Sequence, residues 1–307
     1  MVSTSDEAAI SLDNVTKRYG DIVALSELSF SVRRGEIFGF LGPNGAGKTT
    51  VINLLLNFIR PTTGTVRVLG HDAQRESPQI RSQTGILPEH SGVYDQLTGY
   101  EHVEFAVESK NVDDDPSKIL ERVGLVEAAD RKAGSYSKGM TQRLLLGMAL
   151  VGSPDLLILD EPTSALDPRG ARMVREIVTE ENNRGATVFF SSHILSQVEA
   201  VCDHVGILRD GSLVVDDTLD RLREETADTT LTVNVDSIPD GALESVRQLS
   251  GVSTLAADGT TLTVSCADTA ETAVLNTLEE AGASLESFTN ENGSLENLFM
   301  AYTEENL

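Results

Sequence analysis

Residues 42–49 have the types and spacing of a loop that binds phosphate groups. The pattern G-x-x-x-x-G-K-[ST] is matched by Gly42, Pro43, Asn44, Gly45, Ala46, Gly47, Lys48 and Thr49. The glycines leave room for backbone N–H groups to curl around phosphates, and a following helix directs its positive dipole end at them. Lys48 is expected to reach the β- and γ-phosphates, and the Thr49 hydroxyl to bind Mg²⁺. We include the next residue, Thr50, in this predicted nucleotide site. A plain glycine-rich turn is the alternative.

Two acidic residues follow an apolar run farther along the chain. Residues 156–159 predict a buried strand, with Asp160 and Glu161 at its carboxyl end. That end can place Asp160 beside the Mg²⁺ held by Thr49. Glu161 can orient or deprotonate the water that attacks the γ-phosphate. A strand that ends in solvated acids is the alternative, and the loop of residues 42–49 disfavours it.

The elements that must position these residues alternate between strands and helices. From Ile10 to about Asp217, short apolar runs alternate with segments of helical period, which is typical of an α/β domain with a largely parallel sheet. We expect the phosphate loop to lead into a helix at 48–59. Apolar positions within residues 86–153 predict a mostly helical segment inserted into the sheet domain, with a break at Asp113-Asp114-Asp115-Pro116.

The composition changes after about residue 220. The last 88 residues contain 17 acidic and only three basic side chains. Strand-like and helix-like runs follow the order β-α-β-β-α-β, which fits a small ferredoxin-like module. The expected elements are a strand at 230–235, a helix at 240–249, a hairpin turn at 258–259, a helix at 271–280, a strand at 284–288 and a last helix at 295–302. We therefore predict two domains, 1–219 and 220–307.

The charge excludes one class of partner. The chain of 307 residues carries 48 acidic and 24 basic side chains, a net charge of −24, and only six of the basic residues are lysines. Nucleic acid is disfavoured as the main partner because phosphate backbones require a basic surface. Excess carboxylate instead favours solvation in a salt-rich cytoplasm. No window approaches the roughly 20 apolar residues of a membrane span, and residues 1–9 lack the features of a signal peptide.

A third motif lies between the phosphate loop and the acidic strand. Residues 135–143 precede an expected helix and resemble the ABC ATPases, whose signature reads L-S-G-G-Q followed by Gln and Arg. The matching run, Tyr136-Ser137-Lys138-Gly139-Met140, keeps the serine and the second glycine. The resemblance implies that Ser137 and Gly139 contact the γ-phosphate. Without the family, the same residues indicate only a helix cap.

Other positions match the family in the same order. The resemblance implies that Tyr19 stacks on adenine, that Asp167 belongs to the loop joining the two active sites of a dimer, and that His193 contacts the γ-phosphate. Glu89 stands where the family usually has a glutamine that binds Mg²⁺ and water and forms the hinge to the helical subdomain. A carboxylate there retains the ability to bind a metal.

The resemblance implies a P-loop ATPase that forms a head-to-tail homodimer, or pairs with a second ATPase subunit, around two ATP molecules. Lys48, Glu161 and His193 are the implied catalytic residues. Residues 295–302 and 94–98 are similar to ATPase subunits of ABC-2-type exporters, which work with a separate membrane permease at the cytoplasmic face of the membrane. A soluble ABC ATPase serving as an assembly or mechanical factor is the alternative. A scaffold that no longer hydrolyses ATP is disfavoured because the catalytic residues are present.

Overall fold

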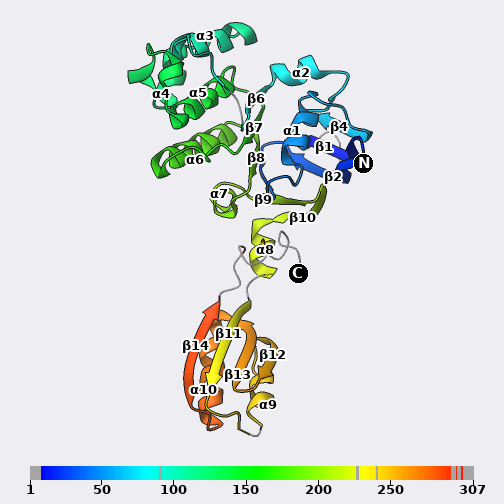
Figure 1. Ribbon diagram of the computed structural model, residues 1–307, viewed down its shortest axis with the longest axis vertical. Helices are drawn as coiled ribbons and strands as arrows, with labels where there is room; N and C mark the ends of the chain where they lie inside the picture. The colour runs from blue at the N-terminus through cyan, green and yellow to red at the C-terminus, as the bar shows by residue number, and fades with distance from the viewer. Residues whose placement is uncertain are drawn as a thin grey trace. The chain divides into compact units, whose positions relative to one another are not determined.

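The chain forms two units, Met1–Leu219 and Asp220–Leu307. The computed structural model describes residues 8–89, 92–225, 228–239 and 241–291, together with residues 295 and 299 (Figure 1). No helix within these ranges is long and apolar enough to cross a bilayer. Helix α8 (Leu219–Glu225) lies at the boundary between the units.

A six-stranded sheet carries the predicted site in the first unit. Its order is β10 (Ser212–Thr218), β9 (His204–Arg209), β3 (Ile37–Leu41), β8 (Thr187–Ser192), β7 (Leu156–Asp160) and β6 (Thr84–Leu87). All neighbours are parallel except β10, which runs antiparallel to β9. Every residue of β3, β7 and β8 is buried, as expected for strands covered on both faces. The predicted parallel α/β fold is confirmed.

A second, antiparallel sheet completes the core of this unit. Its order is β2 (Ile22–Arg33), β1 (Ala8–Tyr19), β4 (Thr63–Val68) and β5 (His71–Asp72). Phe30 of β2 lies with its ring centroid 5.6 Å from that of Phe38 and 5.5 Å from that of Phe40, both on β3. These rings belong to one apolar cluster with residues of α1, so β2 of the antiparallel sheet packs against β3 of the six-stranded sheet.

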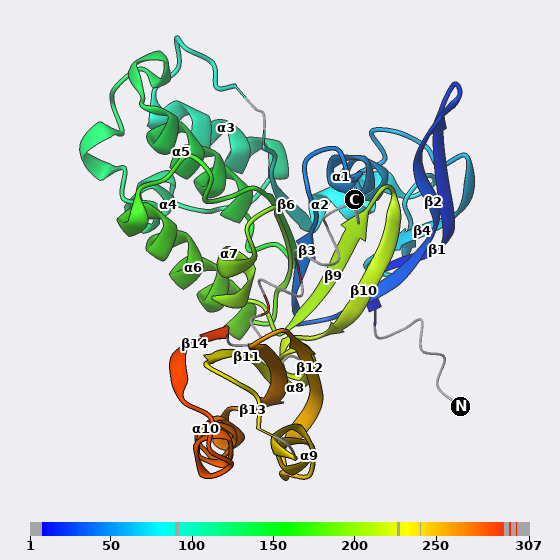
Figure 2. The same cartoon turned by 60° about the horizontal axis from the view of Figure 1, so that its bottom comes forward.

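The helices of the first unit fall into two groups. Three of them, α3 (Gly99–Lys110), α4 (Pro116–Arg122) and α5 (Lys138–Leu150), lie together beside β6 and away from the antiparallel sheet (Figures 1 and 2). The others are α1 (Lys48–Leu55), α2 (Ser77–Ser82), α6 (Pro168–Asn183) and α7 (Leu195–Glu199), with short 3₁₀ turns at Val126–Ala128 and Ala133–Ser135. The expected break between α3 and α4 is present, and Asp115 caps α4 by accepting the Ser117 N–H at 2.9 Å.

Helix α1 is shorter than predicted. It ends at Leu55 rather than Ile59, because Asn57 adopts a left-handed backbone with φ 56°. The Phe58 N–H then donates to Asn53 O at 2.8 Å and the Asn57 N–H to Leu54 O at 3.2 Å. This is a Schellman ending, which satisfies carbonyls that the helix would otherwise leave unpaired. The sequence gives only a weak signal for it because asparagine, not glycine, occupies the left-handed position.

The second unit has the predicted order of elements. These are β11 (Asp228–Val235), α9 (Ala242–Arg247), β12 (Val252–Asp258), β13 (Thr261–Ala267), α10 (Glu271–Glu280) and β14 (Leu285–Glu291). The sheet order is β12-β13-β11-β14 with antiparallel neighbours, as in a ferredoxin-like module. The inward residues of β11 and β13 pack with α9 and α10 in a separate apolar core. Apart from residues 295 and 299, the last predicted helix lies outside the described residues.

His204, at the start of β9, has a carboxylate at each ring nitrogen. Its Nδ1 lies 3.0 Å from Glu36 Oε1, and its Nε2 lies 2.9 Å from Asp216 Oδ1. The two carboxylates, Asp216 first, raise the pKa of His204 to about 9. Since the unfolded value is about 6.5, the stabilisation is complete below that pH and is lost as the pH rises through 9.

We expect His204→Gln to lower the free energy of unfolding by about 1–3 kcal/mol at pH 6, because the charged ring and its two partners are lost. At pH 10.5 the variant and the parent chain should differ little. Urea denaturation at the two pH values measures this difference. An equal loss of stability at both would show that the ring acts by packing rather than by charge.

Candidate functional site

The phosphate loop joins the buried strand β3 directly to helix α1. Gly47 has φ 112°, and a Cβ there would lie 2.9 Å from Ala24 O. At Gly42 a Cβ would lie 2.5 Å from Leu208 O. Both positions therefore require glycine on steric grounds. The first turn of α1 begins at Lys48 and carries Thr49, whose side chain is exposed. A ligand in the loop would face the backbone N–H groups of this helix start.

Lys48 points back into the loop. Its Nζ donates to Gly42 O at 2.6 Å and to Pro43 O at 3.2 Å, and the side chain is buried. Burial lowers the pKa of Lys48, while Glu161 and Asp160 oppose the shift. The ammonium group therefore lies close to both acids of the predicted site, although 112 residues separate Lys48 from Asp160 in the sequence.

The ends of three parallel strands bring these groups together. Leu41 of β3 is paired with Ser192 of β8, and Asp160 of β7 with Ser191 of β8. Asp160 and Glu161 are 3% and 2% exposed. Burial raises the pKa of Asp160 to about 6, and the charges of Glu89 and Glu161 act in the same direction. A buried carboxylate of this kind gains from a cation beside it.

Glu161 is held from both its side chain and its backbone. Its Oε1 lies 2.7 Å from His193 Nδ1. Its backbone has φ 48°, a left-handed conformation that costs a non-glycine residue about 1–3 kcal/mol. The Glu161 carbonyl accepts from Gln142 Nε2 at 3.3 Å and from Ser164 Oγ at 3.0 Å. The sequence assigns no role to these two supporting residues, although Gln142 lies just after the signature run.

Ser137, Gly139 and Asp167 lie in a different place from the loop. Ser137 caps α5 by accepting the Met140 N–H at 3.3 Å, and Asp167 caps α6 by accepting the Gly170 N–H at 2.7 Å. Together with Gly139 they line a pocket of about 1000 Å³. The described lining includes neither the phosphate loop nor Asp160 or Glu161. Within the described residues, the predicted site residues therefore fall into two separate groups.

The remaining predicted residues have clear positions. Tyr19 ends β1 with its side chain 48% exposed, and Lys17 Nζ lies 4.8 Å from its ring centroid. Glu89 is exposed, and its charge acts on both Lys48 and Asp160. Within the described ranges, no three His, Cys, Asp or Glu side chains are arranged to hold a metal. The oxygens of Thr49, Asp160 and Glu89 fit Mg²⁺, which readily takes phosphate and water as its other ligands.

Comparisons with known proteins point to one family. The family described as "ABC transporter" matches residues 25–164. The bacitracin transport ATP-binding protein BcrA of Bacillus licheniformis is 39% identical over 221 residues, covering 70% of this chain and 71% of that protein. The daunorubicin resistance ATP-binding protein DrrA3 of Streptomyces coeruleorubidus is 32% identical over 305 residues, covering 97% and 96%.

Solved structures of ATP-binding cassettes also resemble this chain over about 70% of its length. One described as the ATP-binding subunit of an ABC transporter has a TM-score of 0.66 and 28% identity, covering 71% of this chain and 92% of that one. A dimeric cassette, MJ0796, described as a post-hydrolysis state bound to ADP and Pi, has a TM-score of 0.63. It is 24% identical and covers 68% of this chain and 98% of that one, so it supports the fold.

The buried charge of Asp160 should lower the stability of the chain. Because its pKa rises from about 3.9 when unfolded to about 6 when folded, the carboxylate destabilises the fold fully above pH 6 and not below about pH 4. We expect Asp160→Asn to raise the free energy of unfolding by about 1–3 kcal/mol at pH 7.5 without nucleotide, and by less at pH 4.5. Denaturant titration tests this expectation. A variant less stable than the parent at pH 7.5 would contradict it.

Proposed function

This chain belongs to the ATP-binding subunits of ABC transporters, which are ATPases, and from that premise we propose that it powers export through a separate membrane permease. The proposed cargo is a small organic compound that harms the cell. This class is supported by the relatives named for bacitracin transport and daunorubicin resistance. The daunorubicin relative carries the most weight because its similarity extends over nearly the whole chain, including the second unit.

The observation that carries the mechanism is the separation of the two groups of site residues. The phosphate loop, Asp160 and Glu161 meet at the end of the parallel sheet, whereas Ser137 and Asp167 line another pocket. We propose that two copies, or this chain and a similar subunit, associate head to tail. Each ATP then lies between the loop of one copy and the Ser137 pocket of the other.

The residues at the phosphate loop would supply positive charge to the phosphates of ATP and a base for the attacking water. Mg²⁺ would be held by Thr49 and Asp160, with Glu89 as a further oxygen ligand, and would add positive charge at the β- and γ-phosphates. Lys48 would exchange its bonds to the loop carbonyls for phosphate oxygens. Glu161 accepts a proton from the water that attacks the γ-phosphorus, as the bond from phosphorus to the β,γ-bridging oxygen breaks. His193 keeps its contact with Glu161 through Nδ1, which leaves Nε2 available for the γ-phosphate.

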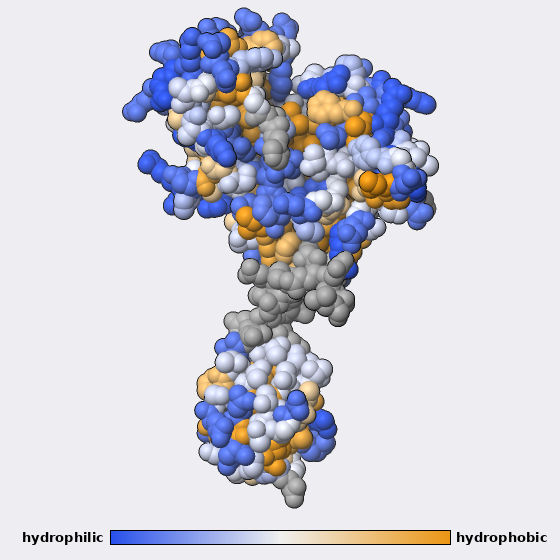
Figure 3. Space-filling model, viewed as in Figure 1, coloured by the Kyte–Doolittle hydropathy of each residue, from blue (hydrophilic) through white to orange (hydrophobic). Residues whose placement is uncertain are grey.

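A groove in the first unit fits the proposed permease. It has a volume of about 330 Å³ and is lined by residues of α3, α5 and β6, by residues just after α1 and by Arg81 of α2. Phe58 and Phe105 line it and are 60% and 53% exposed. Apolar residues are also visible at the surface between the α3–α5 group and the region of α1 (Figure 3). Such a groove suits the apolar face of a short helix from the cytoplasmic side of a permease.

The groove is connected to the nucleotide side through one strand. Thr84, Gly85 and Ile86 of β6 line it, and the same strand ends two residues before Glu89. Glu89 in turn acts on Lys48 and Asp160. We propose that the chain works at the cytoplasmic face of the membrane, with residues 1–219 as the ATPase domain and residues 220–307 as a separate acidic module.

Replacing Glu161, the proposed base, should leave ATP binding intact and stop ATP hydrolysis. We expect Glu161→Gln to bind ATP and to accumulate as an ATP-bound dimer, with phosphate release lowered by at least about 100-fold, because an amide does not accept the proton. Size-exclusion chromatography with ATP and a phosphate-release assay measure both effects. Glu108→Gln, on the exposed face of α3, is the matched control. Turnover at the parent rate in Glu161→Gln would refute its assignment as the base.

A charged residue in the groove should prevent binding of the permease without affecting ATP hydrolysis. We expect Phe105→Glu to hydrolyse ATP at the parent rate as an isolated chain and to lose co-purification with the permease from detergent extracts, because burying a carboxylate in an apolar contact is unfavourable. Phe288→Glu, which changes an exposed aromatic residue of the second unit, is the control. Retention of the permease by Phe105→Glu at the control level would exclude this groove as the docking site.

A further inference from the structure

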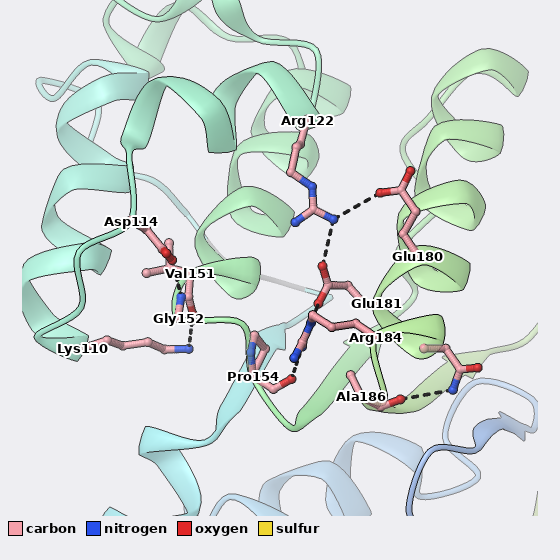
Figure 4. A network of polar contacts seen from close by, with 11 residues as sticks. Lys110, Asp114, Arg122, Val151, Gly152, Pro154, Glu180, Glu181, Arg184 and Ala186 are labelled. Carbon is pink, nitrogen blue, oxygen red and sulfur yellow. Dashed lines mark hydrogen bonds and ion pairs between the residues drawn. The ribbon is translucent and has the colours of Figure 1, made fainter.

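One carboxylate far from the nucleotide groups is buried between two arginines. Glu181, near the end of α6, has a side chain only 5% exposed. Its Oε1 lies 2.8 Å from Arg122 Nη2, and its Oε2 lies 2.9 Å from Arg184 Nε and 2.8 Å from Arg184 Nη2 (Figure 4). Its neighbour Glu180 also contacts Arg122, at 3.2 Å, but is 64% exposed. The two neighbouring acids therefore share a partner and differ in burial.

The two arginines connect Glu181 to different parts of the first unit. Arg122 is the last residue of α4, so its contact joins the α3–α5 group to α6. Arg184 caps α6 and also donates to Pro154 O at 2.6 Å. Pro154 belongs to the connection of residues 151–155 between α5 and β7. Glu181 thus links α4, α6 and the start of the strand that carries Asp160.

The connection between α5 and β7 is held at two further points. Lys110 of α3 donates from Nζ to Val151 O at 2.8 Å, and the Gly152 N–H donates to Asp114 Oδ2 at 2.6 Å. Figure 4 shows these contacts beside those of Arg184, on one side of the α4–α6 contact. With three of its carbonyl or amide groups bonded to side chains, this connection has little freedom to bend.

On the other side of α4, a further contact connects this helix to the pocket of Ser137. Arg143 of α5 donates from Nη1 to Gly124 O at 2.8 Å and to Val123 O at 3.3 Å, just after α4. Gly124 and Arg143 both line the pocket, whose opposite wall is the first half of α6. The position of α4 relative to α6 therefore determines the spacing between Ser137 on one wall and Asp167 on the other.

Opposite charges at a short distance stabilise the Arg122–Glu181 contact. Burial alone would lower the pKa of Arg122, but Glu181 and Glu180 raise it overall. A buried carboxylate that keeps only one of two guanidinium partners is left poorly compensated. The contact consequently disfavours separation of α4 from α6, which an exposed pair would permit.

We propose that Glu181 is a positioning residue: with Arg122 and Arg184 it fixes the Ser137 pocket relative to the strand that carries Asp160 and Glu161. This inference rests on the proposed function, because the pocket acts on the nucleotide of the second copy. Loss of the Glu181 charge lets α4 and α5 shift against α6. The pocket then fits the second copy's ATP less well, while the phosphate loop of the same chain is unchanged.

The test compares Glu181→Gln with the matched control Glu180→Gln, each in the full chain. Affinity of the monomer for a fluorescent ATP analogue is measured at protein concentrations too low for dimerisation. ATP-driven dimerisation is measured in the Glu161→Gln background, and KM and kcat in the parent background. For Glu181→Gln we expect monomer affinity within about twofold of the control, but about tenfold more ATP for half-maximal dimerisation and a raised KM with kcat less affected.

Arg184→Gln is the second variant in case Glu181→Gln does not fold. It keeps the Arg122–Glu181 contact and removes the bonds of Arg184 to Glu181 and to Pro154, so a smaller shift in the same direction is expected. Dimerisation of the tested variant at the control's ATP concentration would overturn the inference, as would an equal loss of monomer affinity. If Glu180→Gln itself forms no dimer with ATP, the proposed function fails instead of the positioning role.

Discussion

Two buried acids beside one buried ammonium group are the constraint on which the first unit depends. Asp160 and Glu161 lie at the carboxyl end of β7, and Lys48 follows the carboxyl end of β3, from which β7 is separated only by β8. The parallel register places all three at one edge. This arrangement buries two carboxylates beside one ammonium group, so it is costly by itself and is suited to a site that receives a cation together with its phosphates.

In the proposed mechanism the same unit does not complete a site alone. The strained backbone of Glu161 is held by Gln142 of α5, so the catalytic strand and the signature helix are joined within one chain. The described lining of the Ser137 pocket nevertheless includes no residue of the phosphate loop of that chain. Because the strand of Glu161 and helix α5 are joined within each copy, ATP bound at one site of the proposed dimer can influence ATP binding at the other.

The sequence predicted what local sterics and strand order determine. Gly42 and Gly47 follow from the space that the loop needs, and Asp160 follows from its place after an apolar strand. The end of α1 was missed because Asn57 gives only a weak stop signal. Glu181 was missed because its partner Arg122 is 59 residues away on a helix of another group. Such a contact has no period or motif, and the left-handed Glu161 likewise depends on its surroundings alone.

The central claim is that each ATP is bound by residues of two copies. Mixing Lys48→Ala chains with Gly139→Asp chains tests it most directly, because in a hybrid dimer one site keeps an intact loop from one copy and an intact Ser137 pocket from the other. The account predicts that each variant alone is nearly inactive and that the mixture regains ATP hydrolysis. A mixture no more active than its two components would contradict it.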